Sequence, residues 1–103
     1  MNLQVVQTDK LAAPLEAASA TPTPLIRAQG VQTLLLDLGS GQSVGPCEMR
    51  NTVLYYVIRG RGRLEVGDEA SDLREGTLAV VAAGSVRRVS AIEPMRLLLV
   101  QIP

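Results

Sequence analysis

The stretch GQSVGPCEMRNTVLYYVIRGRGRLEVGDE, residues 41–69, points most clearly to a fold. Within it, residues that favour strands run over 47–58, or over 49–58 if the strand begins at the methionine. Gly60 and Gly62 then bracket a tight turn, and a second strand returns after them. Apolar strands separated by glycine turns predict an antiparallel β structure.

The same pattern continues on both sides of this stretch. Turn residues such as Gln29-Gly30 and Gly67-Asp68 separate short runs of branched aliphatic residues. Many short strands at regular spacing, with almost no helix, predict an all-β fold, either a closed barrel or a jelly roll. Closure would also hide the strand edges of a valine-rich chain. The predicted strands cover residues 25–28, 31–38, 47–58, 63–66, 71–74, 78–82, 86–91 and 95–102.

Residues 1–24 differ in composition from the rest and are predicted to form a loosely held N-terminal arm, which leaves residues 25–103 as the barrel domain. Residues 3–6 have the pattern of a short strand, and such a strand could pair with a partner subunit. Prolines at the end of the arm block continuation of a helix and favour extended chain. A single helical turn around residues 15–18 is the alternative.

Composition limits the classes of function. The 103 residues amount to one domain with zero net charge, which disfavours nucleic acid and anionic membranes as partners. No apolar run is long enough to span a bilayer, and the N-terminus lacks the pattern of a signal peptide. Cys47 is the only cysteine, so no internal disulfide can form, and we expect a cytoplasmic protein.

The sequence contains no histidine. Histidine is the commonest metal ligand and the side chain that titrates nearest to neutral pH. Catalysis by Ser-His-Asp or Cys-His groups is therefore excluded, as are zinc sites built on histidine.

A second stretch, LREGTLAVVAAGSVRRV at residues 73–89, is informative together with the first. The two stretches resemble the two motifs of the small single-domain cupins, which are RmlC-like jelly-roll barrels. The resemblance covers roughly residues 31–102 and rests on the YVIRG ending at Gly60 and on the glycine frame of Gly76 and Gly84. It implies a cupin-type double-stranded β-helix, commonly dimeric.

The resemblance also implies a metal site made of two histidines, a glutamate and a further histidine. Counting from Gly60 and Gly84, those positions are Cys47 and Met49 (or Pro46 and Glu48 with a longer spacer), Val53 and Arg87. All four of the usual ligands are thus replaced. We therefore expect no metal and no other cofactor.

Strand alternation gives a separate prediction about these positions. If Cys47 faces inward, then residues of the same parity on that strand do so too. The barrel would then hold a pocket with an aliphatic floor and a few polar groups, as ligand sites usually do. The candidate ligand-binding residues are Cys47, Met49, Val53, Tyr55 and Arg87.

Several of these residues admit more than one interpretation. Cys47 is either a small buried hydrophobe or a reactive thiolate activated by Arg87, and with Met49 it is a weak candidate pair for Cu(I). Arg87 either forms a structural ion pair or holds an anionic ligand, and the lack of an inward acid favours the ligand. Arg88 should face outward. The arginines of residues 59–63 are attributed to a hairpin turn, not to nucleic-acid binding.

In the apolar C-terminal segment at residues 95–100, apolar residues follow one another instead of alternating with polar ones. This predicts that both faces of the strand are covered and that the chain forms a homodimer. Three functions remain open. The first is a metal-free cupin-like barrel that binds a small anionic or polar organic ligand without turnover. The second is a metal-independent isomerase or epimerase, and the third is a structural dimer with a barrel filled by side chains. Fold alone does not choose among them.

Overall fold

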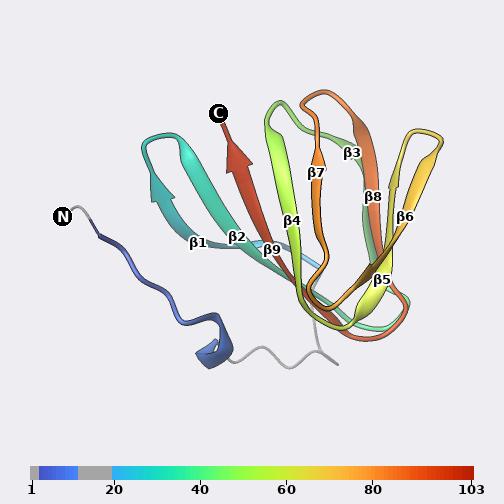
Figure 1. Cartoon of the computed structure of the whole chain (residues 1–103), viewed down its shortest axis with the longest axis horizontal. Helices are drawn as coiled ribbons and strands as arrows, with labels where there is room; N and C mark the ends of the chain where they lie inside the picture. The colour runs from blue at the N-terminus through green and yellow to red at the C-terminus, as the bar shows by residue number, and fades with distance from the viewer. Residues whose placement is uncertain (1–2, 12–19) are drawn as a thin grey trace.

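The computed structural model describes residues 3–11 and 20–103. Within them lie one short 3-10 turn, η1, and nine β-strands (Figure 1). The elements are η1 (Thr8–Lys10), β1 (Thr23–Ala28), β2 (Val31–Leu38), β3 (Ser43–Glu48), β4 (Thr52–Arg59), β5 (Arg61–Val66), β6 (Glu69–Arg74), β7 (Leu78–Val81), β8 (Val86–Ala91) and β9 (Met95–Ile102). None of the helical structure in the described residues is long and apolar enough to cross a membrane.

The strands form two antiparallel sheets that face each other. One sheet has the order β1-β2-β9-β4-β7, and the other has the order β3-β8-β5-β6. The chain passes from one sheet to the other after β2, β3, β4, β6, β7 and β8, so that strands next to each other in sequence often lie in different sheets. This arrangement confirms the predicted all-β jelly roll.

The core lies between the two sheets and follows strand alternation. On β4, Val53, Tyr55 and Val57 are buried, and on β9 the inward residues are Met95, Leu97 and Leu99. Leucines supply most of the inward side chains of β2, since the chain has no Phe or Trp. The inner faces of both sheets therefore carry mainly aliphatic side chains.

The long strand predicted over residues 47–58 is wrong. The chain bends at residues 49–51, so that β3 belongs to the four-stranded sheet and β4 to the five-stranded sheet. At the bend, the side-chain amide Nδ2 of Asn51 donates a hydrogen bond of 3.3 Å to the carbonyl of Ile102. The bend therefore carries the chain from the four-stranded sheet to the five-stranded sheet.

The hairpin turn predicted at Gly60 and Gly62 is also wrong. Gly60 alone separates β4 from β5, and these strands are paired with β9, β7, β6 and β8 but not with each other. Gly62 lies inside β5, opposite Ala91 of β8. The two glycines thus make a crossover between sheets possible.

An ion pair on the outer side of β2 and β9 contacts the N-terminal arm. Asp37 and Arg96 are partners in the sheet register, and the two side chains are joined by Nε–Oδ1 and Nη2–Oδ2 contacts of 2.8 and 3.0 Å. The side chain of Arg96 is 2% exposed, and that of Asp37 is 12% exposed. The hydrogen bond from Arg96 to Asp37 raises the pKa of Arg96, and burial opposes this effect.

The same guanidinium holds η1 in place. Nη1 of Arg96 donates hydrogen bonds to the backbone carbonyls of Thr8 and Leu11, at 3.1 and 2.8 Å. Residues 3–6 are not a strand, so that prediction is wrong, and the predicted helical turn at residues 15–18 lies outside the described residues. The described part of the arm is therefore attached to the barrel by a buried cation.

Candidate functional site

A cavity of about 250 Å³ lies between the sheets, at the end where β3 bends toward β4. Its surface combines side chains of β2, β3, β4, β8 and β9 with Met49 from the bend after β3 and with Pro22, which precedes β1. Most of these side chains are aliphatic, and no Lys, Asp or Glu is among them. The cavity is lined by Pro22, Leu34, Leu36, Val44, Cys47, Met49, Tyr55, Arg87, Val89, Leu99 and Gln101.

Arg87 is the charged group of this cavity, and it is only 2% exposed. Strand β8 directs its side chain inward, as the parity of Arg87, Val89 and Ala91 predicts. Its Nε donates to the carbonyl of Ser85 at 2.9 Å, and its Nη2 donates to the carbonyl of Ala82 at 3.2 Å. These two bonds fix the plane of the guanidinium against the turn before β8.

No carboxylate among the described residues pairs with Arg87. The prediction that Arg87 forms a structural ion pair is therefore wrong. In the described residues, the arginine in an ion pair is Arg96, with Asp37. A guanidinium has five N–H donors, of which Arg87 uses three in the described hydrogen bonds. Arg87 is consequently a buried cation with spare donors and, within the described chain, no compensating anion.

Tyr55 is the third hydrogen-bond partner of Arg87. Nη1 of Arg87 donates to the phenol oxygen of Tyr55 at 3.3 Å, and Tyr55 is only 3% exposed. Because the phenol oxygen acts here as the acceptor, the phenol proton stays available to a second partner. The cavity thus places a neutral O–H donor next to a cationic N–H donor.

Cys47 lies across from Arg87 in the sheet register of β3 and β8. It is an exposed free thiol that lines the cavity, so the interpretation as a small buried hydrophobe is wrong. A register shift between Val44 and Cys47 interrupts the pairing with β8 just before this point. The bulge and the following bend leave the thiol exposed on the cavity lining instead of in the core.

The other predicted residues divide between the cavity and the core. Met49 is half-buried and lines the cavity, whereas Val53 is fully buried in the core and is not part of the cavity surface. The structure therefore brings together Cys47, Met49, Tyr55 and Arg87 but not Val53. Arg88 is exposed, as the strand parity predicts.

Sequence reasoning missed most of the apolar surface of the cavity. Leu34 and Leu36 carried a usable signal, because they alternate along the strand predicted at residues 31–38. Leu99 carried none, since the three consecutive leucines at residues 97–99 do not show which parity of this strand faces inward. Pro22 belongs to the predicted arm, and only the tertiary structure places it beside the cavity.

The side chains at the positions where cupins carry metal ligands do not fit a metal ion. Val53 has no donor atom, and Arg87 is a cation whose nitrogens donate to carbonyl oxygens. Cys47 and Met49 remain as two soft donors, and the buried positive charge of Arg87 in the same cavity disfavours a Cu(I) ion beside them. Within residues 3–11 and 20–103, no group of three or more Cys, Asp or Glu side chains is placed to hold a metal ion.

Solved structures support the fold. The chain is similar to TT1209 from Thermus thermophilus, with a TM-score of 0.84, 23% identity and 98% of each chain covered. It is also similar to a cupin superfamily protein from Desulfitobacterium hafniense, with a TM-score of 0.81 and 18% identity over 99% of this chain and 92% of that one.

A conserved protein of unknown function from Streptococcus pyogenes gives a TM-score of 0.74 at 18% identity, over 99% of this chain and 91% of that one. At these identities, the likeness concerns the fold alone. No curated protein matches the chain. The model of the cupin domain matches residues 35–101, which include both glycine-framed motifs, and the chain therefore belongs to the cupin domain family.

Proposed function

We propose that this cupin barrel binds a small anionic organic molecule between its sheets, without turnover and without a metal, and that Arg87 holds the anion. The observation that carries the proposal is a guanidinium 2% exposed in an aliphatic cavity with no carboxylate partner in the described chain. A buried charge is costly unless an opposite charge compensates it. An anionic ligand would supply that charge and use the spare N–H donors.

The alternatives have weaker support. A barrel filled by side chains is hard to reconcile with a cavity of about 250 Å³ around Arg87. An isomerase would need a positioned acid and base, and the cavity offers only Tyr55 and Cys47 for moving protons. A free exposed thiol is stable in a reducing compartment, so we place the binding role in the cytoplasm.

Thermal denaturation with small anions tests the proposal. Benzoate, succinate and inorganic phosphate are the probes, and at least one of them should raise the Tm of the wild-type chain in proportion to its occupancy. Arg87→Gln should weaken this binding about 10- to 100-fold, because hydrogen bonds to charged groups contribute about 1.5–3 kcal/mol. Arg88→Gln, on the exposed side of the same strand, should leave binding unchanged. Equal binding by the Arg87→Gln variant would refute the proposal.

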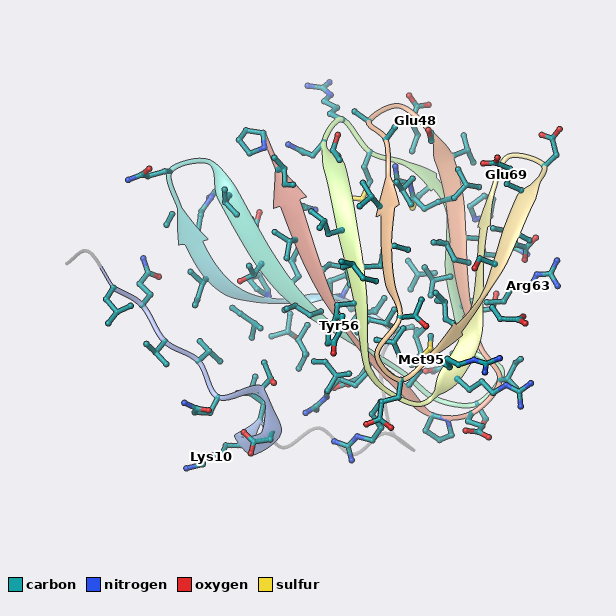
Figure 2. All side chains as sticks on the ribbon, in the orientation of Figure 1. Lys10, Glu48, Tyr56, Arg63, Glu69 and Met95 are labelled. Atoms are coloured by element: carbon teal, nitrogen blue, oxygen red, sulfur yellow. The ribbon has the colours of Figure 1, made fainter. Side chains whose placement is uncertain are left out.

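We also propose that two copies of the chain form a homodimer through the outer face of the five-stranded sheet. There, the register sets Leu54 beside Val80 and Val100, and Tyr56 beside Leu78 and Leu98. Tyr56, labelled in Figure 2, is 41% exposed, and Leu78 and Val80 are each 61% exposed. These two rows carry no charge, so the same patch on a second copy can pack against them about a twofold axis.

Sedimentation velocity at micromolar concentration should give a dimer for the wild-type chain. Val80→Lys should raise the dissociation constant of the dimer at least about 30-fold, because the dimer would then bury two ammonium groups against the apolar patch. Val86→Lys is the matched control, since this valine is 49% exposed but lies in the other sheet. A wild-type monomer, or equal effects of both substitutions, would contradict this interface.

A further inference from the structure

From the same cavity, we infer the class of ligand: a compact monocarboxylate with an apolar body, either a short hydrocarbon chain or a single aromatic ring. This inference rests on the proposed function and narrows it. The proposed function requires only that Arg87 hold an anion. The inference adds that the anion carries one charge, that its head is a carboxylate and that the rest of the molecule is hydrocarbon.

The charges of the cavity set the charge of the ligand. Arg87 is the single charged side chain among its lining residues. A second anionic group on the same ligand would enter the aliphatic cavity without a cation to compensate it, at the cost of its hydration. A dicarboxylate or a sugar phosphate is therefore disfavoured, and a ligand with one negative charge neutralises the single positive charge of Arg87.

The donors of the cavity set the head group. The guanidinium of Arg87 and the phenol of Tyr55 are adjacent, with 3.3 Å between Nη1 and Oη. A planar carboxylate has two oxygens, which can take one N–H from Arg87 and the O–H from Tyr55. A phosphate has three terminal oxygens and up to two charges, and the only other polar side chain of the lining, apart from the Cys47 thiol, is Gln101. The donor set therefore matches a carboxylate better than a phosphate.

The remaining surface sets the body of the ligand. Leucines and valines from β2, β3, β8 and β9 cover it, so the hydroxyl groups of a sugar would lose their hydrogen bonds to water there. For size, an apolar cavity of about 150 Å³ is large enough to bind benzene. The present cavity, at about 250 Å³, has room for such a ring together with a carboxylate. The sulfur atoms of Cys47 and Met49 would also contact an aromatic ring favourably.

Cys47 provides a readout that is specific to this cavity. It is the only cysteine of the sequence, it is exposed and it lines the cavity. A bound ligand should thus slow its alkylation by iodoacetamide, whereas binding elsewhere on the surface should not. The alkylation rate of the unfolded chain in the presence of each probe controls for direct reaction between probe and reagent.

The experiment compares benzoate and hexanoate with succinate, inorganic phosphate, glucose 6-phosphate and the neutral amide benzamide, by calorimetry and by protection of Cys47. Benzoate or hexanoate should bind at least about tenfold more tightly than each of the other probes and should protect the thiol. Tyr55→Phe should weaken benzoate binding about 3- to 10-fold, because one neutral donor is lost. Arg88→Gln should bind benzoate like the wild type.

The outcomes separate this inference from the proposed function. Tighter binding of succinate or a phosphate that depends on Arg87 would overturn the monocarboxylate class and leave the anion-binding role intact. Binding of benzamide as tight as that of benzoate would overturn both, as would the failure of every anion to bind. The benzoate–benzamide comparison uses the wild-type chain, so it decides the matter even if Arg87→Gln does not fold.

Discussion

Asp37→Ala should lower the free energy of unfolding by about 3–5 kcal/mol, measured by urea denaturation, because it leaves the cation of Arg96 buried without its anionic partner. The Arg96 side chain is 2% exposed, and both of its contacts to Asp37 are shorter than or equal to 3.0 Å. The remaining bonds of the guanidinium go to the neutral carbonyls of Thr8 and Leu11. Neutral acceptors do not replace the lost negative charge.

Two further variants separate the loss of charge from the loss of packing. Asp37→Asn keeps the shape and one acceptor oxygen, and it should cost less than Asp37→Ala. The double variant Asp37→Ala with Arg96→Met removes both charges and keeps most of the arginine stem. It should recover at least about 2 kcal/mol relative to Asp37→Ala alone. A double variant less stable than Asp37→Ala would mean that Arg96 stabilises the fold mainly through other contacts.

The arm supplies a second measurement on the same residues. The amides of Lys10 and Leu11 donate to the carbonyls of Gln7 and Thr8 inside the 3-10 turn. Arg96 holds this turn by its own bonds to Thr8 and Leu11. Hydrogen exchange of these two amides should therefore be faster in every variant that lacks Arg96. Global unfolding would speed exchange throughout the barrel, so faster exchange confined to these two amides reports the loss of the local contacts.

The fold could be predicted because alternation and turn chemistry agree along most of the chain. The strands predicted at residues 31–38, 86–91 and 95–102 coincide with β2, β8 and β9. The error at residues 47–58 has a physical cause. Residues on both sides of the bend favour strands, and local propensity does not reveal that the two halves belong to different sheets. Likewise, the spacing of Gly60 and Gly62 fits a hairpin, whereas the close approach of other strands determines their actual role.

The candidate site could be predicted only in part. The inward parity of Arg87 and Tyr55 followed from strand alternation, which is a local property. The exposure of Cys47 depends on the bulge between Val44 and Cys47 and on the bend after β3. Gly45 and Pro46 are residues typical of a bulge, but they do not show to which sheet the following residues belong. The ion pair of Asp37 and Arg96 joins residues far apart in sequence, so only the register of β2 and β9 brings it together.

Gly60→Ala should destabilise the barrel by about 3 kcal/mol or more in the same urea experiment, because two costs add at this crossover. The backbone at Gly60 has φ +93°, a region that residues with a side chain rarely adopt. In addition, a Cβ there would collide with the backbone carbonyl oxygen of Pro94 and would lie 2.6 Å from the Cα of Met95. Both obstacles are backbone atoms, one of Pro94 just before β9 and one of Met95 at its start, and they cannot rotate away as a side chain could.

Two other glycines isolate the separate costs. Gly76 has a positive φ of +87°, but a Cβ there meets nothing within 4 Å, so Gly76→Ala should cost only about 1–2 kcal/mol. Gly62 has no positive φ, yet a Cβ there would collide with the carbonyl oxygen of Ser90 and approach the side chain of Met95. Gly62→Ala should therefore cost about 1–3 kcal/mol through crowding alone. If Gly60→Ala proved no more costly than Gly76→Ala, the turn before β9 would have to move aside freely, and the tight crossover between the sheets would not constrain the fold.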